Sequence, residues 1–381
     1  MSAAPAMKTL VMKTLGTWLA VLALSTVTQA AAQSASPLAV PPTAPPPETV
    51  ASTLSVAAVG DIMLGTDFPQ NRLADDDGAS LLGPAEPLLR SADVAFGNLE
   101  GVLLDGGEPA KTCTDPGACY LFRSPTRYAA HLADAGFTVM SLANNHARDF
   151  GEEGRDASMT ALAAHGIRHS GRDGDVASWN VDGLQVAMIA FAPFKGAHDL
   201  LSPDDAQALI AALAADHDIV IVSMHAGGEA GDVSRVPFAE EFYRGENRGD
   251  VAGFARGAVD AGADLVIGHG PHVPRGIEIH HGRLIAYSLG NFATYYGIRV
   301  TGDNGLAPLL MVDLASDGSL LSGQIHSFRQ RRPNGPVADP EQEAGQVIER
   351  LSLSNFPDSA PEFSDDGKFR PRPVPQSSAA D

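Results

Sequence analysis

The sequence is short of positive charge, and beyond its first 30 or so residues it has no apolar run long enough to span a membrane. It contains 26 Lys and Arg residues against 46 Asp and Glu residues, a formal net charge of −20 at pH 7. A field of that sign repels nucleic acid and anionic lipid, so nucleic acid is excluded as a partner. It would also repel an anionic substrate. A site for a phosphate or polycarboxylate therefore needs something cationic, and bound metal ions would serve.

The sequence also has little cysteine, with only Cys113 and Cys119, separated by five residues in a loop-like segment. A C-x-x-C spacing is absent and no histidine is adjacent, which disfavours a redox or metal-binding pair. In an oxidising compartment such a pair most simply forms a local disulfide. We therefore expect a Cys113–Cys119 disulfide that staples a surface loop.

The first 32 residues have the pattern of a secretory signal peptide. Lys8 and Lys13 precede an apolar run over 15–27, and small residues follow at 30–32. A membrane anchor is the alternative, but the run is shorter than the ~20 apolar residues that a bilayer requires. No cysteine lies near the expected cleavage point, which disfavours a lipoprotein anchor. We expect a periplasmic or secreted protein.

The rest of the chain divides by composition into three parts. Residues 33–52 are rich in proline and form a linker too poor in apolar side chains to fold. Residues 53–332 are expected to form one folded domain. Residues 333–381 are rich in Pro, Ser, Asp and Glu, and we expect a largely disordered tail with one short helix around Glu341–Leu353.

Within the domain, short apolar runs end repeatedly in polar loops. The runs are LSVAAVG, DVAFG, FTVMSLA, DIVIVSM and ADLVIG, each the length of a strand buried on both faces. Helical spacing of apolar residues over 206–213 and 251–259 predicts two amphipathic helices, and 125–135 and 152–164 are further candidates. Hairpin signals also occur at VDG, at HHG with His280 and His281, and at SDG. The pattern predicts a layered α/β sandwich with mixed sheets.

The polar loops contain residues that can bind metal. The motifs are GDIM with Asp61, GNLE with Asn98 and Glu100, NNH with Asn144, Asn145 and His146, MHAGGE with His225 and Glu229, and GHGPH with His269 and His272. Each residue alone is as well explained as a turn, cap or satisfied polar group. Loops at one edge of a sheet can converge on one site, however. Carboxylate, amide and imidazole ligands together suit Mn, Fe or Zn, and a bridging carboxylate suits a pair of ions.

These motifs resemble those of a known family. VGDIML, FGNLEG, SLANNHARDFG, IVSMHAGGE and ADLVIGHGPHVPRGIEIHHGRLIAYSLGNF occur in order between about Ser55 and Phe292. This order resembles the CapA (poly-γ-glutamate capsule synthesis) family and is similar to that of calcineurin-like metallophosphoesterases. The resemblance implies a four-layer α-β-β-α sandwich, a role in capsule or exopolymer biosynthesis, and a site for two divalent metal ions.

The resemblance also implies a role for each residue. The metal ligands by motif are Asp61, Glu100, Asn145, His225, His269 and His272, with Glu100 bridging the ions, and His146 is the candidate general acid. Asn98, Asn144, Glu229 and Asn291 are expected around these ligands or toward the substrate. Glu229 either orients His225 or is an ordinary loop acid.

The sequence departs from the phosphoesterase pattern at Met63, where that pattern has a histidine two residues after the first aspartate. A thioether is a very weak ligand for these metals, so one ion is short of a ligand. Catalysis is therefore an open question, and three functions remain. The first is a CapA-like protein with a metal-dependent hydrolytic or transfer step in synthesis, release or export of an anionic polymer. The second is a periplasmic phosphoesterase. The third is a non-catalytic, polymer-binding partner of membrane synthase subunits.

Overall fold

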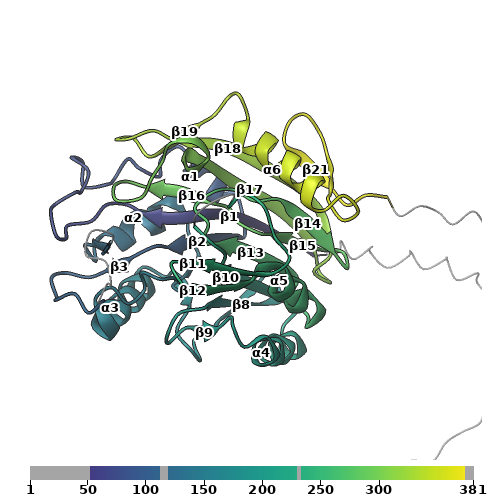
Figure 1. Ribbon diagram of the computed structural model, residues 1–381, viewed down its shortest axis with the longest axis horizontal. Coiled ribbons are helices and arrows are strands. Elements are labelled where there is room, and N and C mark those ends of the chain that lie inside the picture. Colours follow the sequence, from purple (N-terminus) through teal and green to yellow (C-terminus); the bar gives the residue numbers. More distant parts are fainter. Residues whose placement is uncertain (1–51, 112–118, 230–232, 374–381) are drawn as a thin grey trace, which may run out of the picture. The chain divides into compact units, whose positions relative to one another are not determined.

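The computed structural model describes residues 52–111, 119–229 and 233–373, which form a mixed α/β fold around two large sheets (Figure 1). The expected signal peptide, nearly all of the linker, Cys113 and residues 374–381 lie outside the described residues. Those parts, and the Cys113–Cys119 disulfide, stay predictions. No helix of the described part is long and apolar enough to cross a membrane.

The first sheet has ten strands in the order β20-β21-β18-β17-β1-β2-β5-β6, with β16 pairing β1 and β19 pairing β18. Its strands are β1 Thr53–Met63, β2 Val94–Leu99, β5 Val139–Ser141, β6 Arg168–Ser170, β16 Asn291–Thr294, β17 Leu306–Ala315, β18 Leu320–Gln330, β19 Pro336–Ala338, β20 Glu362–Phe363 and β21 Lys368–Arg370. Strands β1, β2, β5 and β6 pair in parallel, whereas β17 pairs β1 and β18 antiparallel. The sheet is therefore mixed, as predicted.

The second sheet has seven strands in the order β14-β15-β13-β10-β8-β7, with β9 pairing β8. Its strands are β7 Ala177–Val181, β8 Leu184–Ala192, β9 His198–Asp199, β10 Ile219–His225, β13 Leu265–His269, β14 Ile277–His280 and β15 Arg283–Ala286. Two short pairs lie outside both sheets. They are β3 Val102–Leu103 with β4 Arg123–Ser124, and β11 Glu240–Tyr243 with β12 Glu246–Asp250. The predicted hairpins β7–β8, β14–β15 and β17–β18 are present.

Three apolar cores define four layers. The first core lies between the sheets and joins Phe96 of β2 to Ile221 of β10. On the outer side of the first sheet, helices α1 Glu86–Leu89, α2 Tyr128–Ala135 and α3 Gly151–Ala164 pack through the second core. On the outer side of the second sheet, α4 Pro203–Asp216 and α5 Val251–Asp260 pack through the third (Figure 1). The order α-β-β-α confirms the predicted fold class.

The helices follow from their apolar spacing and capping. The predicted stripe of α5 is buried, and Asp250 caps the helix by accepting a hydrogen bond from the Gly253 amide at 3.0 Å. Ser124 followed by Pro125 is the pattern of a helix N-cap with proline at the first helical position, but the prediction that Ser124 caps α2 is wrong. Ser124 lies in β4, where its hydroxyl donates to the Gly65 carbonyl at 2.6 Å, and α2 begins only at Tyr128. Its hydroxyl is thus bound to the loop that follows β1 rather than to the helix.

The expectation of a largely disordered tail is wrong for residues 333–373. This segment forms β19, helix α6 Glu343–Asn355, β20 and β21, and the predicted short helix corresponds to α6. Ile348 of α6 and Phe369 of β21 are buried in the core between the sheets. The segment is polar in composition, but a few well-placed apolar side chains close one end of the sandwich.

Candidate metal site

Strand pairing brings three of the predicted ligands, and two asparagines expected around them, to one buried region. In the first sheet, Asp61 at the end of β1 is paired with Asn98 of β2 on one side and Asn291 of β16 on the other. In the second sheet, His225 of β10 is paired with His269 of β13. All five residues have no more than a trace of exposed surface. The two facing sheets therefore present oxygen and nitrogen groups to the same buried region.

Asp61 is at the centre of this region. Its Oδ1 accepts a hydrogen bond from Asn98 Nδ2 at 2.9 Å, and its Oδ2 lies 2.9 Å from His272 Nδ1. His269 Nδ1 is 3.8 Å from Oδ1. Burial alone would raise the pKa of Asp61, but the hydrogen bond and charge of His272 outweigh it and lower the pKa to about 2. Asp61 is therefore a carboxylate at neutral pH.

Glu100 links the two sheets. Its Oε2 accepts from Asn98 Nδ2 at 2.6 Å and lies 3.6 Å from His225 Nδ1, while its Oε1 is buried with no hydrogen-bond partner among the described residues. Burial, together with the negative charge of Asp61, raises the pKa of Glu100 well above its usual value. In the absence of a cation the site cannot easily hold both carboxylates charged.

The two strand-end histidines have unused ring nitrogens. Nε2 of His225 and both ring nitrogens of His269 are buried without a hydrogen-bond partner in the described part of the chain. Burial lowers the pKa of His225 well below its usual value and that of His269 to about 4. Both rings are therefore neutral at pH 7, the form in which imidazole binds metal. Phe96 stacks on His269 with the ring centroids 5.5 Å apart.

His272 adopts a left-handed backbone conformation, with φ of 58°. This is uncommon for a residue other than glycine and is found at functional sites that hold a side chain in place. Its Nδ1 donates to Asp61 Oδ2 and to Asn291 Oδ1, both at 2.9 Å. Burial would lower the pKa of His272, but the hydrogen bond and charge of Asp61 raise it to about 10. The proton on Nδ1 must leave if this nitrogen is to bind a metal ion.

Asn145 follows β5 and reaches the same edge. Its Oδ1 is buried and has no hydrogen-bond partner among the described residues, and its backbone oxygen accepts from Lys111 Nζ at 3.2 Å. The neighbouring Asn144 is tied to the centre, because its amide donates to Asn98 Oδ1 at 3.0 Å and to the Leu99 carbonyl at 2.8 Å. No described contact joins the Asn145 side chain to the other predicted ligands.

The unpartnered atoms are a test of whether this set fits a metal. Buried polar atoms normally have partners, and each one left without costs about 1–3 kcal/mol. Five such atoms occur in the predicted ligand set: Glu100 Oε1, Asn145 Oδ1, His225 Nε2, His269 Nδ1 and His269 Nε2. In addition, ligand atoms of Asp61, Glu100 and His225 lie within 4.8 Å of one another. Free lone pairs on carboxylate, amide and imidazole are the donors that divalent Mn, Fe and Zn take, so the residues present fit such ions.

His146 occupies a separate place beside this set. Its Nδ1 donates to Asp149 Oδ2 at 2.7 Å, and its ring packs on Phe122 with centroids 4.4 Å apart. Burial lowers the pKa of His146, against the opposing charge of Asp149. Asp149 was not singled out from the sequence. Its signal was the spacing of three residues after His146, which places the carboxylate within reach of the ring in the turn before α3.

Comparison with known protein families identifies the family of this chain. The model of the bacterial capsule synthesis protein PGA_cap family matches residues 55–296. The chain belongs to this family. It is 29% identical over 271 residues to the PGA biosynthesis protein CapA of Bacillus subtilis, covering 66% of each chain. It is 28% identical over 275 residues to the capsule biosynthesis protein CapA of Bacillus anthracis, covering 66% of this chain and 62% of that relative. The matches thus span less than two thirds of these relatives.

Solved structures give weaker matches. A 5'-nucleotidase precursor from Thermus thermophilus is 14% identical, covers 78% of this chain and 59% of that chain, and has a TM-score of 0.40. A purple acid phosphatase from yellow lupin is 11% identical, covers 82% and 57% respectively, and has a TM-score of 0.38. These scores are low, and the four-layer fold of this PGA_cap chain rests on the strand pairing and cores described above.

In this PGA_cap chain, Met63 is used for packing. It is buried in a small apolar cluster with Phe122 and Ile298, and its sulfur accepts a hydrogen bond from the Gly65 amide at 3.3 Å. The cluster adjoins His146, because Phe122 contacts both Met63 and the His146 ring. Met63 therefore packs against Phe122, whose ring in turn contacts His146.

Glu229 contacts other partners than the sequence suggested. Arg248 Nη1 donates to its Oε1 at 2.7 Å, and its Oε2 lies 3.9 Å from His272 Nε2. A contact with His225 is not among those of the described residues. Arg248 in turn lies over the ring of Phe194, 4.9 Å from its centroid. Glu229 is therefore an acid that faces His272 and is held by an arginine.

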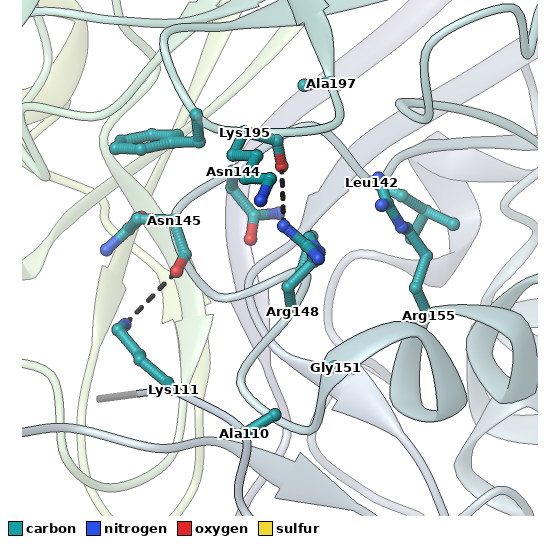
Figure 2. Close-up of a pocket in the computed structure, with 12 residues that line it drawn as sticks. Ala110, Lys111, Leu142, Asn144, Asn145, Arg148, Gly151, Arg155, Lys195 and Ala197 are labelled. Atoms are coloured by element: carbon teal, nitrogen blue, oxygen red, sulfur yellow. Dashed lines mark hydrogen bonds between the residues drawn. The ribbon is translucent and has the colours of Figure 1, made fainter.

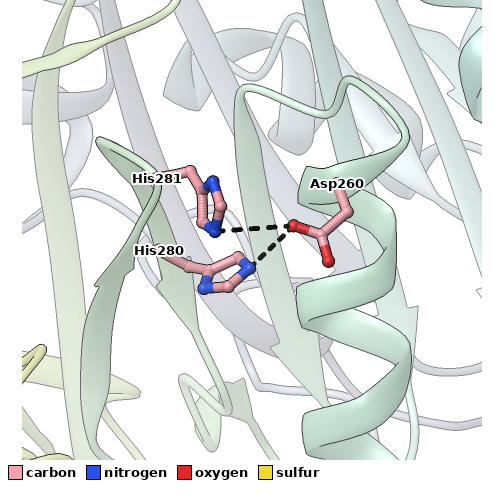
Figure 3. A group of neighbouring side chains, drawn as sticks. All are labelled: Asp260, His280 and His281. Atoms are coloured by element: carbon pink, nitrogen blue, oxygen red, sulfur yellow. Dashed lines mark hydrogen bonds and ion pairs between the residues drawn. The ribbon is translucent and has the colours of Figure 1, made fainter.

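A second group of possible ligands lies at the surface (Figure 3). His280 Nε2 is 2.8 Å from Asp260 Oδ1, and His281 Nε2 is 4.0 Å from the same atom. The His281 side chain is 73% exposed. Both histidines lie at the β14–β15 turn, as predicted, and water can satisfy all three groups. The buried set is the one whose lone pairs need a ligand.

Proposed function

We propose that this chain is an exported protein that acts in the synthesis, release or export of an anionic, poly-γ-glutamate-like capsular polymer through a metal-dependent hydrolytic or transfer step. The observation that carries the proposal is the set of five buried, unpartnered ligand atoms at the ends of facing strands. Membership of the capsule synthesis family and relatives named for PGA and capsule biosynthesis support the choice of polymer.

The residues divide into three roles in this proposal. The carboxylates, Asn145 and the three histidines would hold two divalent ions, of Mn, Fe or Zn. Bound ions would supply the positive charge that neutralises the buried carboxylates and attracts an anionic substrate to an acidic protein. Asn98 holds Asp61 and Glu100 in place, because one amide nitrogen donates to both carboxylates. Asn291 and Glu229 orient His272, because Asn291 Oδ1 accepts a hydrogen bond from its Nδ1 and the Glu229 carboxylate lies 3.9 Å from its Nε2.

His146 is the proton donor of the proposal. Its Nδ1 stays bound to Asp149, which fixes the ring and leaves Nε2 as the atom that moves a proton. Because burial lowers the pKa of His146, Nε2 must take up a proton before it can donate one. The ring of Phe122 packs against the His146 ring and helps to fix it. The histidine is thus oriented by a carboxylate and an aromatic ring, an arrangement used where a proton must move at a defined atom.

A second candidate function is a polymer-binding partner of membrane synthase subunits without catalysis. The packing of Met63 in an apolar cluster favours it, because one metal position then has one ligand fewer than in the phosphoesterase pattern. A periplasmic phosphoesterase uses the same residues on a smaller substrate. All three functions predict a protein outside the cytoplasm.

The test is turnover by the mature protein loaded in turn with Mn²⁺, Fe²⁺ and Zn²⁺. The substrates are high-molecular-weight poly-γ-glutamate, whose shortening is followed by size-exclusion chromatography, and a generic phosphodiester. Metal-dependent shortening of the polymer supports the proposal. Turnover of the phosphodiester alone identifies a phosphoesterase. Metal binding with no turnover of either substrate contradicts the catalytic proposal and supports the binding partner.

A further inference from the structure

A cavity of about 250 Å³ opens beside the candidate metal site. Its walls come from three loops and the first turns of α3, and Asn145 lines it (Figure 2). A second link to the metal site is Phe194, which also lines the cavity and packs against His225 with ring centroids 5.9 Å apart. Any group bound in this cavity therefore lies next to Asn145 and next to the ring that packs against His225.

The charged residues of the wall are all basic. Among the described residues that line the cavity, four are cations and none is an acid: Lys111, Arg148, Arg155 and Lys195. In a chain with 46 acidic and 26 basic residues, such a wall runs against the overall charge. A local positive field inside an acidic protein concentrates anions where the field lines converge.

The carboxylates behind this wall neutralise only part of its charge. Glu152 pairs with Arg148 and with Arg155, each at 2.8 Å, and Asp149 Oδ1 lies 3.1 Å from Lys111 Nζ. Two acids thus face four cations. The excess charge remains on the cavity side.

Lys195 is the cation of the cavity wall whose positive charge is least neutralised by neighbouring groups. It is exposed, and within the part of the chain that the structure describes its amine has no hydrogen-bond or ion-pair partner. Its backbone oxygen accepts from Arg148 Nη1 at 3.2 Å, as Figure 2 shows, so the loop that carries the lysine is fastened to the loop that carries Asn145. The lysine is held near the cavity while its charge stays available.

We propose that this cavity is a subsite that binds one anionic group of the substrate, a carboxylate or a phosphate, next to the metal site, with Lys195 and Arg148 supplying the charge. The cavity is smaller than the roughly 300–1,000 Å³ of pockets for drug-sized ligands, which suits one anionic unit of a longer chain. The inference rests on the proposed function for the place of the reacting bond. It adds the class of substrate group recognised beside that bond.

The test is calorimetric titration of the Mn²⁺-loaded mature protein at low ionic strength with penta-γ-glutamate and, separately, with inorganic phosphate. Lys195→Glu is expected to weaken binding of the preferred probe about tenfold, since it removes one favourable charge and adds an unfavourable one. The matched control is Lys368→Glu on β21, a lysine whose side chain is 62% exposed. It should bind as the wild type does. Added salt should weaken wild-type binding and reduce the difference between the variants.

The two probes identify the source of the anionic group. Binding of penta-γ-glutamate that phosphate does not displace supports a carboxylate subsite, and displacement by phosphate supports a phosphate subsite. Equal affinities of wild type, Lys195→Glu and Lys368→Glu for both probes overturn the proposal. Failure of both probes to bind the wild type also overturns it. Unchanged melting temperature of Lys195→Glu excludes misfolding as the cause of a loss.

Failure of the anion subsite can be distinguished from failure of the proposed catalytic function. If the wild type turns over polymer and Lys195→Glu has an unchanged KM, the subsite is wrong and the catalytic proposal stands. If the wild type binds penta-γ-glutamate without turnover and Lys195→Glu loses that binding, the subsite stands and the catalytic proposal is wrong.

Discussion

His146 Nδ1 lies 2.7 Å from Asp149 Oδ2, and both side chains are buried at the edge of the candidate metal site. The same carboxyl oxygen accepts a hydrogen bond from the Phe122 amide at 2.8 Å, so the acid is itself fixed by the backbone. This chain of contacts sets the orientation of the histidine ring without involving the proposed metal ligands. Proton transfer and metal binding can therefore be separated by substitution.

His146→Asn should preserve bound metal and lower turnover by about 10²–10⁴-fold, the usual contribution of a positioned proton donor. Metal content, melting temperature and turnover are measured on the same preparations. Asp149→Asn should lower turnover in the same direction, and Asp156→Asn on α3, whose side chain is 61% exposed, is the control. A lower melting temperature with unchanged activity per folded molecule would show that His146 only stabilises its turn.

Glu278 should make the fold sensitive to acid. Its buried carboxylate accepts from Arg256 at 2.8 Å and from the Tyr287 hydroxyl at 2.6 Å. Burial would raise the pKa of Glu278, but these hydrogen bonds lower it below the usual 4.5. The stability that it contributes is therefore present above pH 4.5 and is lost as the pH falls through the lower folded value.

Glu278→Gln should accordingly lower the free energy of unfolding by about 2 kcal/mol at pH 7, with the deficit shrinking below pH 4.5. Urea unfolding at several pH values measures this. Asp358→Asn is the control and should change little, because Asp358 is an exposed acid next to Ser359, whose hydroxyl donates to Glu278 at 2.8 Å. A deficit that stays constant from pH 7 to acid would show that the Glu278 charge is not what stabilises the network.

The segment after residue 332 should be required for stability. Ile348 of α6 is 1% exposed and packs in the core between the sheets. Ile348→Ala should cost about 2–5 kcal/mol, as large-to-small changes in cores do. Leu353→Ala on the same helix is the matched control, since that side chain is 45% exposed. Equal melting temperatures for the two variants would mean that α6 does not complete the core in solution.

The sequence and the structure agree best where chemistry follows a strand. Asp61, Glu100, His225 and His269 could be grouped from the sequence because parallel strands end at one edge. The paired registers place Asp61 and the two histidines there, and Glu100 directly follows β2. The expectation failed where a few apolar side chains fold a polar segment, as Ile348 does. The arrangement of Glu229 with Arg248 was also out of reach, since their contact depends on how two loops fold back.

The other contacts that the sequence did not predict are between side chains in loops. Asp149 is three residues after His146, a spacing that a turn converts into a hydrogen bond, but only once the turn is known. The basic cavity joins Lys111, Arg148 and Lys195 from segments far apart in the chain. No local pattern indicates that these side chains meet, because their loops come together only in the folded chain, where Arg148 donates to the Lys195 carbonyl and Lys111 to the Asn145 carbonyl.

The most direct test of the account is the metal content of the purified protein after loading with Mn²⁺ and removal of excess ion, measured by inductively coupled plasma mass spectrometry. Wild type and His281→Ala, which alters only the exposed surface group, should each retain about two equivalents, while His225→Ala and His269→Ala should retain about one or fewer. Wild-type protein that retains less than one equivalent, or His225→Ala and His269→Ala proteins that retain as much as the wild type, would contradict a metal site at the ends of the facing strands.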